Sequence, residues 1–443
     1  MGRSITTKIL RIFVLSLALF AVAFSPFNSH AALDDSSLVS TATIEGRLAV
    51  FDDVWETIQE RYYDPKFHGV DWQAKRTAFR AAAGRARGAN ELYDVLRQMI
   101  ASLKDAHTRV YSPDEKFDWW NPRFVTVGVT TREVEGIPTV IQVEPGSAAA
   151  KTDIRPGDTI VSIDDLPVAE FVTQRLKASG LSHDSVARYR AIATLFDGPA
   201  GTSVKIRWST RGGKHKTVML QRYWNQRHLG FNNQRKGKTA ILRLDAFTQS
   251  VALEFSKSLP EVLDGAESII LDLRSNGGGD AEAMADIASL FLEDGINLGR
   301  FADRSGASFE LQTFSKRLWR TPRSSVSKLP LVVLTSESTS SAAEILVAAL
   351  QNQRRARVIG TVTCGCVLAI RSRHALPDGG VLDVSEFDYR TATGVRLEGV
   401  GVKPDEVSTP KRNDIYSRRD AALETAKEVF SRKSAKLHSA DTN

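Results

Sequence analysis

The sequence predicts a multi-domain α/β protein of 443 residues, with an N-terminal helical region, a small β-rich domain and an α/β core with a buried sheet. Apolar residues recur at helical spacing in residues 41–120, and short strand-like runs joined by Pro-Gly turns fill residues 124–222. Strand-like and helical runs then alternate through residues 236–410, as in crossover units around a buried sheet. Residues 411–443 are expected to form one amphipathic helix near Asp420–Phe430 and a loose polar tail.

The composition is that of a globular protein and argues against several functions. With 42% hydrophobic and 25% charged residues, wholesale disorder is ruled out. The net charge of +7 comes without a long basic block, so we expect no nucleic-acid partner. Two cysteines are too few for a structural zinc site and the H-E-x-x-H motif is absent, so we expect no metal and no cofactor. Only Gly365 separates Cys364 from Cys366, and because a bridge would close a very small ring we expect two thiols.

Residues 1–31 have the features of a secretory signal. A basic start is followed by Ile12–Phe24, an uncharged apolar run shorter than the ~20 residues that span a bilayer. Ser29-His30-Ala31 then offers small residues at the two positions read for cleavage. We therefore expect an exported protein, periplasmic or extracellular, with an uncleaved membrane anchor as the alternative.

The helical region ends in a short polar motif. Asn90 can cap a helix whose apolar residues continue to Leu103, and Lys104-Asp105-Ala106-His107-Thr108 follows. A single histidine at a helix end is commonly only a cap or a surface residue. His107 is therefore a functional candidate only if a partner residue lies elsewhere in the chain.

The β-rich domain contains two characteristic turns, Glu144-Pro145-Gly146-Ser147-Ala148 and Arg155-Pro156-Gly157-Asp158. With the strands around them, and apart from a helical stretch inserted near residues 170–195, these turns resemble a PDZ domain. A PDZ domain binds an extended peptide along a strand edge and receives the terminal carboxylate on backbone N–H groups of a glycine loop. Val127, Gly128 and Val129 would form that loop, and the alternative is a domain that packs but binds no peptide.

A glycine-rich turn follows the buried strand at Ile269–Leu273. The run Ser275-Asn276-Gly277-Gly278-Gly279 leads into a helix, and glycines leave backbone N–H groups uncovered for an oxyanion or a phosphate. The run lacks the Lys-Ser/Thr pair of a nucleotide-binding loop. A plain tight turn would have the same sequence features.

A second polar turn joins a buried strand to a helix. Leu331–Leu334 leads through Thr335–Ser341 into a helical run that begins at Ala342. This places a serine hydroxyl beside helix N-terminal N–H groups, which can hold a developing negative charge. Because Ser and Thr are also favoured helix caps, the turn alone does not identify a nucleophile.

Taken together and in their order along the chain, these motifs resemble those of the C-terminal processing (tail-specific) serine protease family. The resemblance covers roughly residues 48–410 and implies an exported serine endopeptidase with a PDZ domain, acting on peptide or protein substrates by way of their C-termini. The runs that carry it are Leu271–Gly279, Ser341–Ile345, Val358–Thr363, Glu398–Asp405 and Asp105–Thr108.

The resemblance is closer to the tricorn-core-like Ser-His branch of the family than to its Ser-Lys branch. Where many members carry a Lys 25 residues after the Ser, this chain has Cys366, and no Lys occurs between Lys328 and Lys403. The tricorn-like pattern implies Ser341 as nucleophile, His107 as base and Glu398 as the acidic member. It also has a Ser before its His, where this chain has Ala106.

The chemistry implied is peptide hydrolysis through an acyl-enzyme. A neutral imidazole can take the serine proton near pH 7, and backbone N–H groups of Ala342 and of Gly278 or Gly279 would stabilise the oxyanion. Three alternatives stay open: His374 as the base, Cys366 as a redox-sensitive neighbour of the site, and a non-catalytic exported scaffold that binds peptide termini through its PDZ domain. The oligomeric state does not follow from the sequence.

Overall fold

A computed structural model describes most of the chain after the N-terminus. The expected signal at residues 1–31 lies outside the described residues. Among the helices that are described, none combines the length and the hydropathy needed to cross a bilayer. The described residues are 38–115, 123–179, 185–226, 230–314, 326 and 328–440.

The core is built on a six-stranded sheet, as the alternating runs of the sequence predict. Neighbouring strands are parallel except for the antiparallel pair at one edge, β10 and β11. The central strands are buried along almost their whole length, which explains their continuous Val, Ile and Leu runs. The strands in spatial order are β10 (Phe231–Lys236), β11 (Thr239–Leu244), β12 (Ser268–Asp272), β15 (Leu331–Thr335), β16 (Ala356–Gly360) and β20 (Glu406–Val407).

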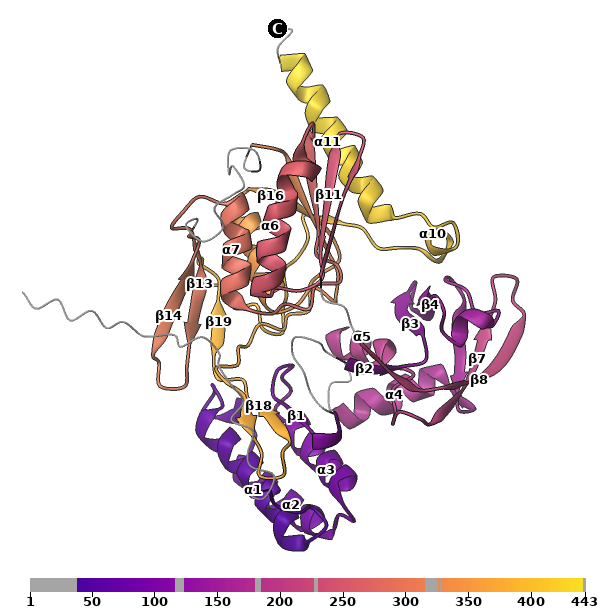
Figure 1. Ribbon diagram of the computed structural model, residues 1–443, viewed down its shortest axis with the longest axis vertical. Helices are drawn as coiled ribbons and strands as arrows, with labels where there is room; N and C mark the ends of the chain where they lie inside the picture. Colours follow the sequence, from indigo (N-terminus) through magenta and orange to yellow (C-terminus); the bar gives the residue numbers. More distant parts are fainter. Residues whose placement is uncertain are drawn as a thin grey trace, which may run out of the picture. The chain divides into compact units, whose positions relative to one another are not determined.

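Helices cover both faces of this sheet (Figure 1). Side chains alternate along each strand, so Leu242 packs with α6 (Gln249–Leu263), α7 (Ala281–Phe291) and α9 (Ala342–Asn352), whereas Ile241 packs with α11. The C-terminal helix α11 (Ala421–Ala440) follows the short α10 (Arg412–Tyr416). It continues well past the predicted end at Phe430, because Arg, Lys, Ala and Leu in the polar tail are good helix formers.

The helical region consists of α1 (Ile44–Arg61), α2 (Trp72–Arg85) and α3 (Ala89–Ala101). After the Asp105–Thr108 motif, β1 (Arg109–Tyr111) pairs with β18 (Val381–Asp383), which pairs with β17 (His374–Ala375). Leu376 and Leu382 join the apolar cluster of the three helices. Chain from late in the sequence therefore completes the helical region, next to the histidine motif.

The PDZ-like domain is a second sheet with two helices. β3 lies at one edge, and α5 (Ser185–Ala193) runs beside it, since the hydroxyl of Thr131 donates to the carbonyl of Ile192 at 2.6 Å. The other helix is α4 (Val168–Ser179), and β2 (Arg123–Thr126) pairs with β9 (Tyr223–Gln226). The sheet contains β3 (Val129–Val134), β4 (Ile137–Val143), β5 (Thr159–Ile163), β7 (Ser203–Ser209) and β8 (His215–Gln221), with β6 (Leu166–Pro167) paired to β5.

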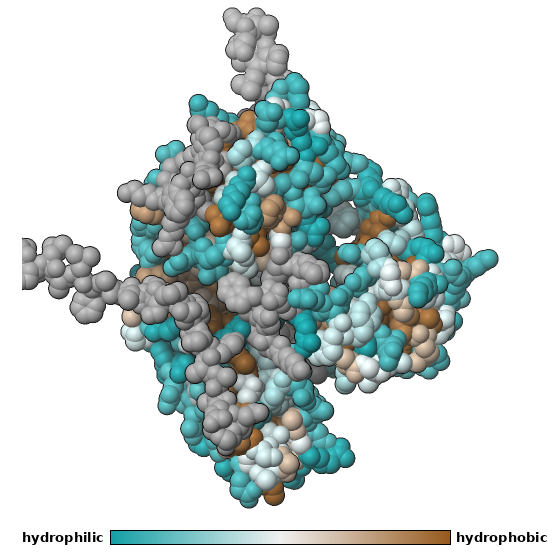
Figure 2. All heavy atoms as spheres, in the orientation of Figure 1, coloured by the Kyte–Doolittle hydropathy of each residue, from teal (hydrophilic) through white to brown (hydrophobic). Residues whose placement is uncertain are grey.

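Smaller elements complete the described chain. A three-stranded sheet has the order β14 (Ser308–Gln312), β13 (Asn297–Ala302) and β19 (Asp388–Arg390). Short 3-10 turns occur at Phe67–Gly69, Pro113–Glu115 and Ala149–Lys151. On the face of the molecule seen in Figure 2, hydrophilic side chains cover most of the described surface and apolar ones form small scattered patches.

Candidate active site

Ser341 stands at the turn between β15 and α9 in an uncommon backbone conformation. Its φ is 57° and its ψ is −128°, a region that residues other than glycine seldom occupy. Its N–H donates to the carbonyl of Cys366 at 2.8 Å and to Oε2 of Glu344 at 3.1 Å. Strained residues that their surroundings hold in place are concentrated at functional sites, which makes this serine a candidate.

The predicted glycine loop closes against this turn. A Cβ on Gly278 would lie 2.6 Å from Cβ of Ser341 and 3.1 Å from N of Ala342, so only glycine permits the approach. The N–H of Gly278 donates to Oδ1 of Asn276 at 2.8 Å and is therefore already engaged. Within the described chain the N–H groups of Gly279 and Ala342 make no hydrogen bond. These two amides are the ones that can receive an oxyanion.

Glu344 is a buried anchor that our sequence reasoning missed. Its carboxylate accepts four hydrogen bonds: from the N–H groups of Ser341, Gly365 and Cys366 and from the hydroxyl of Thr363. Burial raises the pKa of Glu344, and the four donors oppose that rise. The available signal was a single acid within the otherwise apolar run of α9, which needs buried donors around it.

Asp105 holds the backbone of the histidine motif. Its Oδ1 accepts the N–H groups of His107 at 2.8 Å and Thr108 at 2.6 Å and the hydroxyl of Ser385 at 3.0 Å. The His107 ring is half-buried, and its Nδ1 is buried without a hydrogen-bond partner. Burial, aided by the charge of Arg109 and opposed by that of Asp105, lowers the pKa of His107 to about 4. The imidazole is therefore neutral at pH 7, the form that can accept a proton.

One short segment, Cys364–Cys366, contacts both the serine turn and the histidine motif. Ala106 packs against the two cysteines, while the carbonyl of Cys366 accepts the N–H of Ser341. Among the described residues no hydrogen bond joins Oγ of Ser341 to the imidazole of His107. The structure thus brings the two loops onto a common support and does not show the proton path between them.

The carboxylate of Glu398 is hydrogen-bonded to the backbone directly after the Cys364–Cys366 segment. Its Oε2 accepts the N–H groups of Val367 at 2.7 Å and Leu368 at 3.2 Å. Burial raises the pKa of Glu398 to about 7, with the charge of Asp105 adding to the rise. In the described structure Glu398 makes no hydrogen bond to His107, and Asp105 is the carboxylate whose charge acts on the imidazole.

The cysteines correct one of our expectations. Two thiols are predicted from the sequence, whereas Cys364 and Cys366 form a disulfide with a Cα–Cα distance of 5.2 Å. Gly365 adopts a φ of 67°, which turns the chain enough to bring the flanking residues within the usual span of a disulfide.

His374 and the glycine loop of the PDZ-like domain lie elsewhere. Nε2 of His374, on β17, is 2.7 Å from Oδ2 of Asp53 on α1. Val127, Gly128 and Val129 precede and begin the edge strand β3; Gly128 has a φ of 79°, and its N–H donates to Oγ1 of Thr126. Both valines are buried, so the loop presents backbone rather than side chains at the start of that edge.

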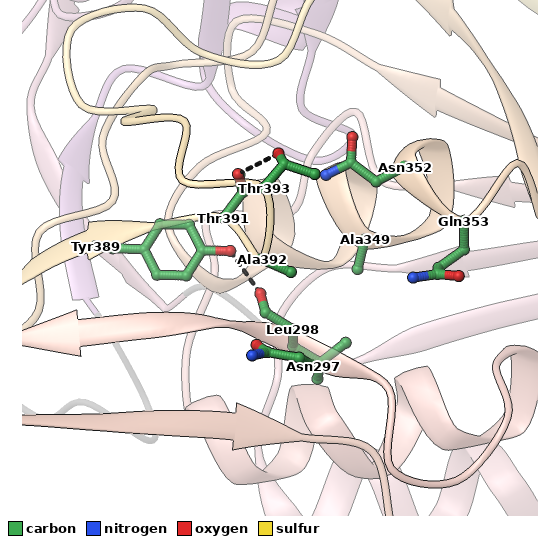
Figure 3. A pocket seen from close by; sticks show the side chains of 9 residues that line it. All are labelled: Asn297, Leu298, Ala349, Asn352, Gln353, Tyr389, Thr391, Ala392 and Thr393. Atoms are coloured by element: carbon green, nitrogen blue, oxygen red, sulfur yellow. Dashed lines mark hydrogen bonds between the residues drawn. The ribbon is translucent and has the colours of Figure 1, made fainter.

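A small cavity of about 80 Å³ lies at the opposite end of α9 from Ser341 (Figure 3). Its walls include Ala349 and Asn352 of that helix and Gln353 directly after it, and the hydroxyl of Tyr389 donates to the carbonyl of Leu298 beside it. No residue of the candidate site lines this cavity. Within the described ranges, no group of three or more His, Cys, Asp or Glu is arranged to hold a metal.

Comparison with protein families matches three parts of the chain. Residues 238–408 match peptidase family S41, residues 46–101 match the tricorn protease C1 domain, and residues 125–185 match the PDZ domain. These are the α/β core, most of the helical region and the first part of the β-rich domain.

Curated relatives carry names of one kind. A carboxyl-terminal-processing protease of Picosynechococcus is 29% identical over 371 residues, covering 80% of this chain and 81% of the relative. A carboxyl-terminal-processing peptidase 1, chloroplastic, of Arabidopsis thaliana is 26% identical and covers 87% of this chain and 76% of the relative. The carboxy-terminal processing protease CtpA of Bacillus subtilis is 25% identical and covers 70% and 62%.

Solved structures agree with the fold. The photosystem II D1 C-terminal processing protease is 25% identical with a TM-score of 0.53, covering 82% of this chain and 93% of that one. Mature CPAF is 14% identical with a TM-score of 0.67, covering 87% and 96%, a likeness of fold alone. These matches support the C-terminal processing protease family, and the chain is a serine-type peptidase.

Proposed function

We propose that the protein is an exported endopeptidase in which Ser341 attacks the substrate carbonyl, with His107 as general base and Glu398 as the acidic member. The observation that carries this is the shared support of the two loops: the strained Ser341 turn and the Asp105–Thr108 motif both rest on Cys364–Cys366. The position of a Ser-Lys lysine is occupied by Cys366, whose sulfur is in a disulfide. We therefore do not propose a lysine from this segment as the general base.

The reaction would run through an acyl-enzyme. His107 takes the proton from Oγ of Ser341 as the oxygen attacks the carbonyl carbon, and the N–H groups of Ala342 and Gly279 receive the negative charge on the carbonyl oxygen. The imidazolium then gives its proton to the leaving amine. A water molecule, deprotonated by the same ring, releases the acyl group.

The lack of a hydrogen bond between Oγ of Ser341 and the imidazole of His107 among the described residues is compatible with this mechanism. Catalytic hydrogen bonds are often long or unformed in a free enzyme and tighten when substrate binds. Ser341 and His107 lie on separate loops, so the proposal requires a movement of one or both to set the contact. The unpartnered Nδ1 of His107 is the ring atom to which a water or a carboxylate would bind to fix the tautomer.

The proposed substrates are peptides or proteins presented by their C-termini. β3 is an unpaired sheet edge bordered by α5, where an extended peptide can add as a strand, and Val127–Val129 stands at its start. Two side chains of the PDZ-like domain also contact the serine turn: Arg132 pairs with Glu337, and Tyr189 hydrogen-bonds to Ser338. A terminus bound at β3 would thus be held near the nucleophile.

Export is proposed from the features of residues 1–31. The scaffold alternative is not favoured, because the matched families and named relatives are peptidases.

A fluorophosphonate probe followed by peptide mapping tests the nucleophile. We expect wild-type protein to be labelled at Ser341 and Ser341→Ala to be unlabelled and inactive on an unfolded protein. Ser340→Ala is the matched control, since the Ser340 hydroxyl only donates to the carbonyl of Gly277. The Ser340→Ala protein should still be labelled at Ser341. Cleavage retained in Ser341→Ala would contradict the proposal.

A further inference from the structure

The disulfide between Cys364 and Cys366 forms part of the support of the proposed catalytic residues. The carbonyl of Cys366 accepts the N–H of Ser341 at 2.8 Å, and the N–H of Cys364 donates to the carbonyl of Thr339 at 2.9 Å. The bridged loop therefore holds the turn that ends in the nucleophile at two points.

The same loop also holds Glu344. The N–H of Gly365 donates to Oε1 at 2.6 Å and the N–H of Cys366 to Oε2 at 2.9 Å. Because Glu344 in turn accepts the N–H of Ser341, any shift of residues 364–366 reaches the serine both directly and through this carboxylate.

The two cysteines also pack against the histidine motif. Ala106, the residue before His107, packs against both cysteines, which are only 6% and 4% exposed. Two thiols cannot remain at bonding distance, so breaking the bridge requires the sulfurs to separate in this tight space. With one residue between the cysteines, the backbone of 364–366 has to absorb the movement.

A cation is placed where it would assist exchange. Nη2 of Arg190 lies 3.0 Å from Sγ of Cys366 and 3.7 Å from Sγ of Cys364. A guanidinium at that distance favours a thiolate, the leaving group when a disulfide is attacked.

We propose that Cys364–Cys366 is a thiol–disulfide exchange site whose oxidised form keeps Ser341 and His107 in working register and whose reduced form is catalytically impaired. The reductant is of the dithiol class. Its thiolate attacks one sulfur and displaces the other as a thiolate, which takes up a proton; its second thiol then breaks the mixed disulfide. The chain gains two electrons and two protons as two thiols, and the reductant becomes a cyclic disulfide. This proposal rests on the proposed peptidase function.

The test uses the full-length wild-type protein, because its two cysteines are the only ones in the chain. Protein purified under air is treated with dithiothreitol and then re-oxidised. Before reduction, after reduction and after re-oxidation, thiols are counted by alkylation and intact mass, and kcat and KM are measured. We expect zero thiols before and two after, a fall in kcat of at least about tenfold with KM nearly constant, and recovery on re-oxidation. Two thiols with unchanged kcat, or a bridge that resists the reductant in the folded protein, would overturn the proposal.

A readout that does not need activity separates this proposal from the proposed function. Hydrogen exchange of the N–H groups of Ser341, Gly365 and Cys366 should accelerate at least about tenfold on reduction, since their hydrogen bonds depend on the loop. Unchanged exchange in protein with two thiols contradicts the exchange site even if the oxidised protein cleaves nothing. A Cys364→Ser/Cys366→Ser variant should match reduced wild type in kcat and be insensitive to dithiothreitol. Kinetics equal to oxidised wild type would count against the proposal.

Discussion

At the scale of single residues, the proposed base and acidic member have pKa values displaced in opposite directions. Burial lowers that of His107 to about 4 and raises that of Glu398 to about 7. Above pH 7 the imidazole is neutral and the carboxylate is charged, which is the pair of states that the mechanism needs. Between pH 4 and pH 7 the imidazole is still neutral while Glu398 is protonated and cannot stabilise an imidazolium.

We therefore expect kcat/KM to fall as the pH drops through about 7, with an apparent pKa that belongs to Glu398 and not to the histidine. The measurement is a pH–rate profile with one peptide substrate between pH 4 and pH 9. A profile that stays flat from pH 9 down to pH 5 would show that Glu398 need not be charged.

Glu398→Gln tests the same residue without a titration. The amide oxygen can still accept the N–H groups of Val367 and Leu368, so the loop is retained while the charge is lost. We expect kcat to fall at least about tenfold and the acidic limb near pH 7 to disappear. Because the raised pKa makes the wild type lose stability as pH rises from 4.5 to 7, the variant should gain stability relative to it over that range. An unchanged limb would point to Asp105, whose carboxylate binds the backbone of His107, as the acidic member.

At the scale of elements, the glycine loop and the start of α9 form one unit. Gly278→Ala should reduce kcat/KM by about a hundredfold or more, since its Cβ would meet Cβ of Ser341 and the N of Ala342. Gly277→Ala is the matched control, because its Cβ would meet only Oγ of Ser340, at 4.0 Å, and it should stay within about twofold of wild type. Equal kinetics for the two variants would show that the close approach has no role.

The buried anchor of α9 gives a prediction on stability. All four partners of Glu344 are donors, so in Glu344→Gln the amide NH₂ must face at least one of them. We expect the free energy of unfolding to fall by about 2 kcal/mol or more, measured by denaturant titration. Glu261→Gln, on the exposed face of α6, should leave it unchanged. A Glu344→Gln protein as stable as the Glu261→Gln control would contradict the anchoring role.

At the scale of the whole molecule, the sequence predicted the three regions and most strands and helices of the core, because buried parallel strands leave continuous apolar runs such as Leu331–Leu334. It also indicated the turn at Ser341 and the glycines that pack against it. It did not show that β17 and β18 complete the helical region, since such pairing depends on contacts far apart in sequence. The disulfide was missed for a similar reason, because a positive φ at Gly365 is not visible in the residue order.

The central claim is that an imidazole from the helical region deprotonates a serine of the core. The most direct measurement is the single-turnover rate of acylation of Ser341 at pH 8 in wild type, His107→Ala and His374→Ala, the last being the matched histidine that pairs with Asp53. We expect His107→Ala to lose between about a hundredfold and ten thousandfold while His374→Ala stays close to wild type. Acylation at the wild-type rate in His107→Ala would contradict the account.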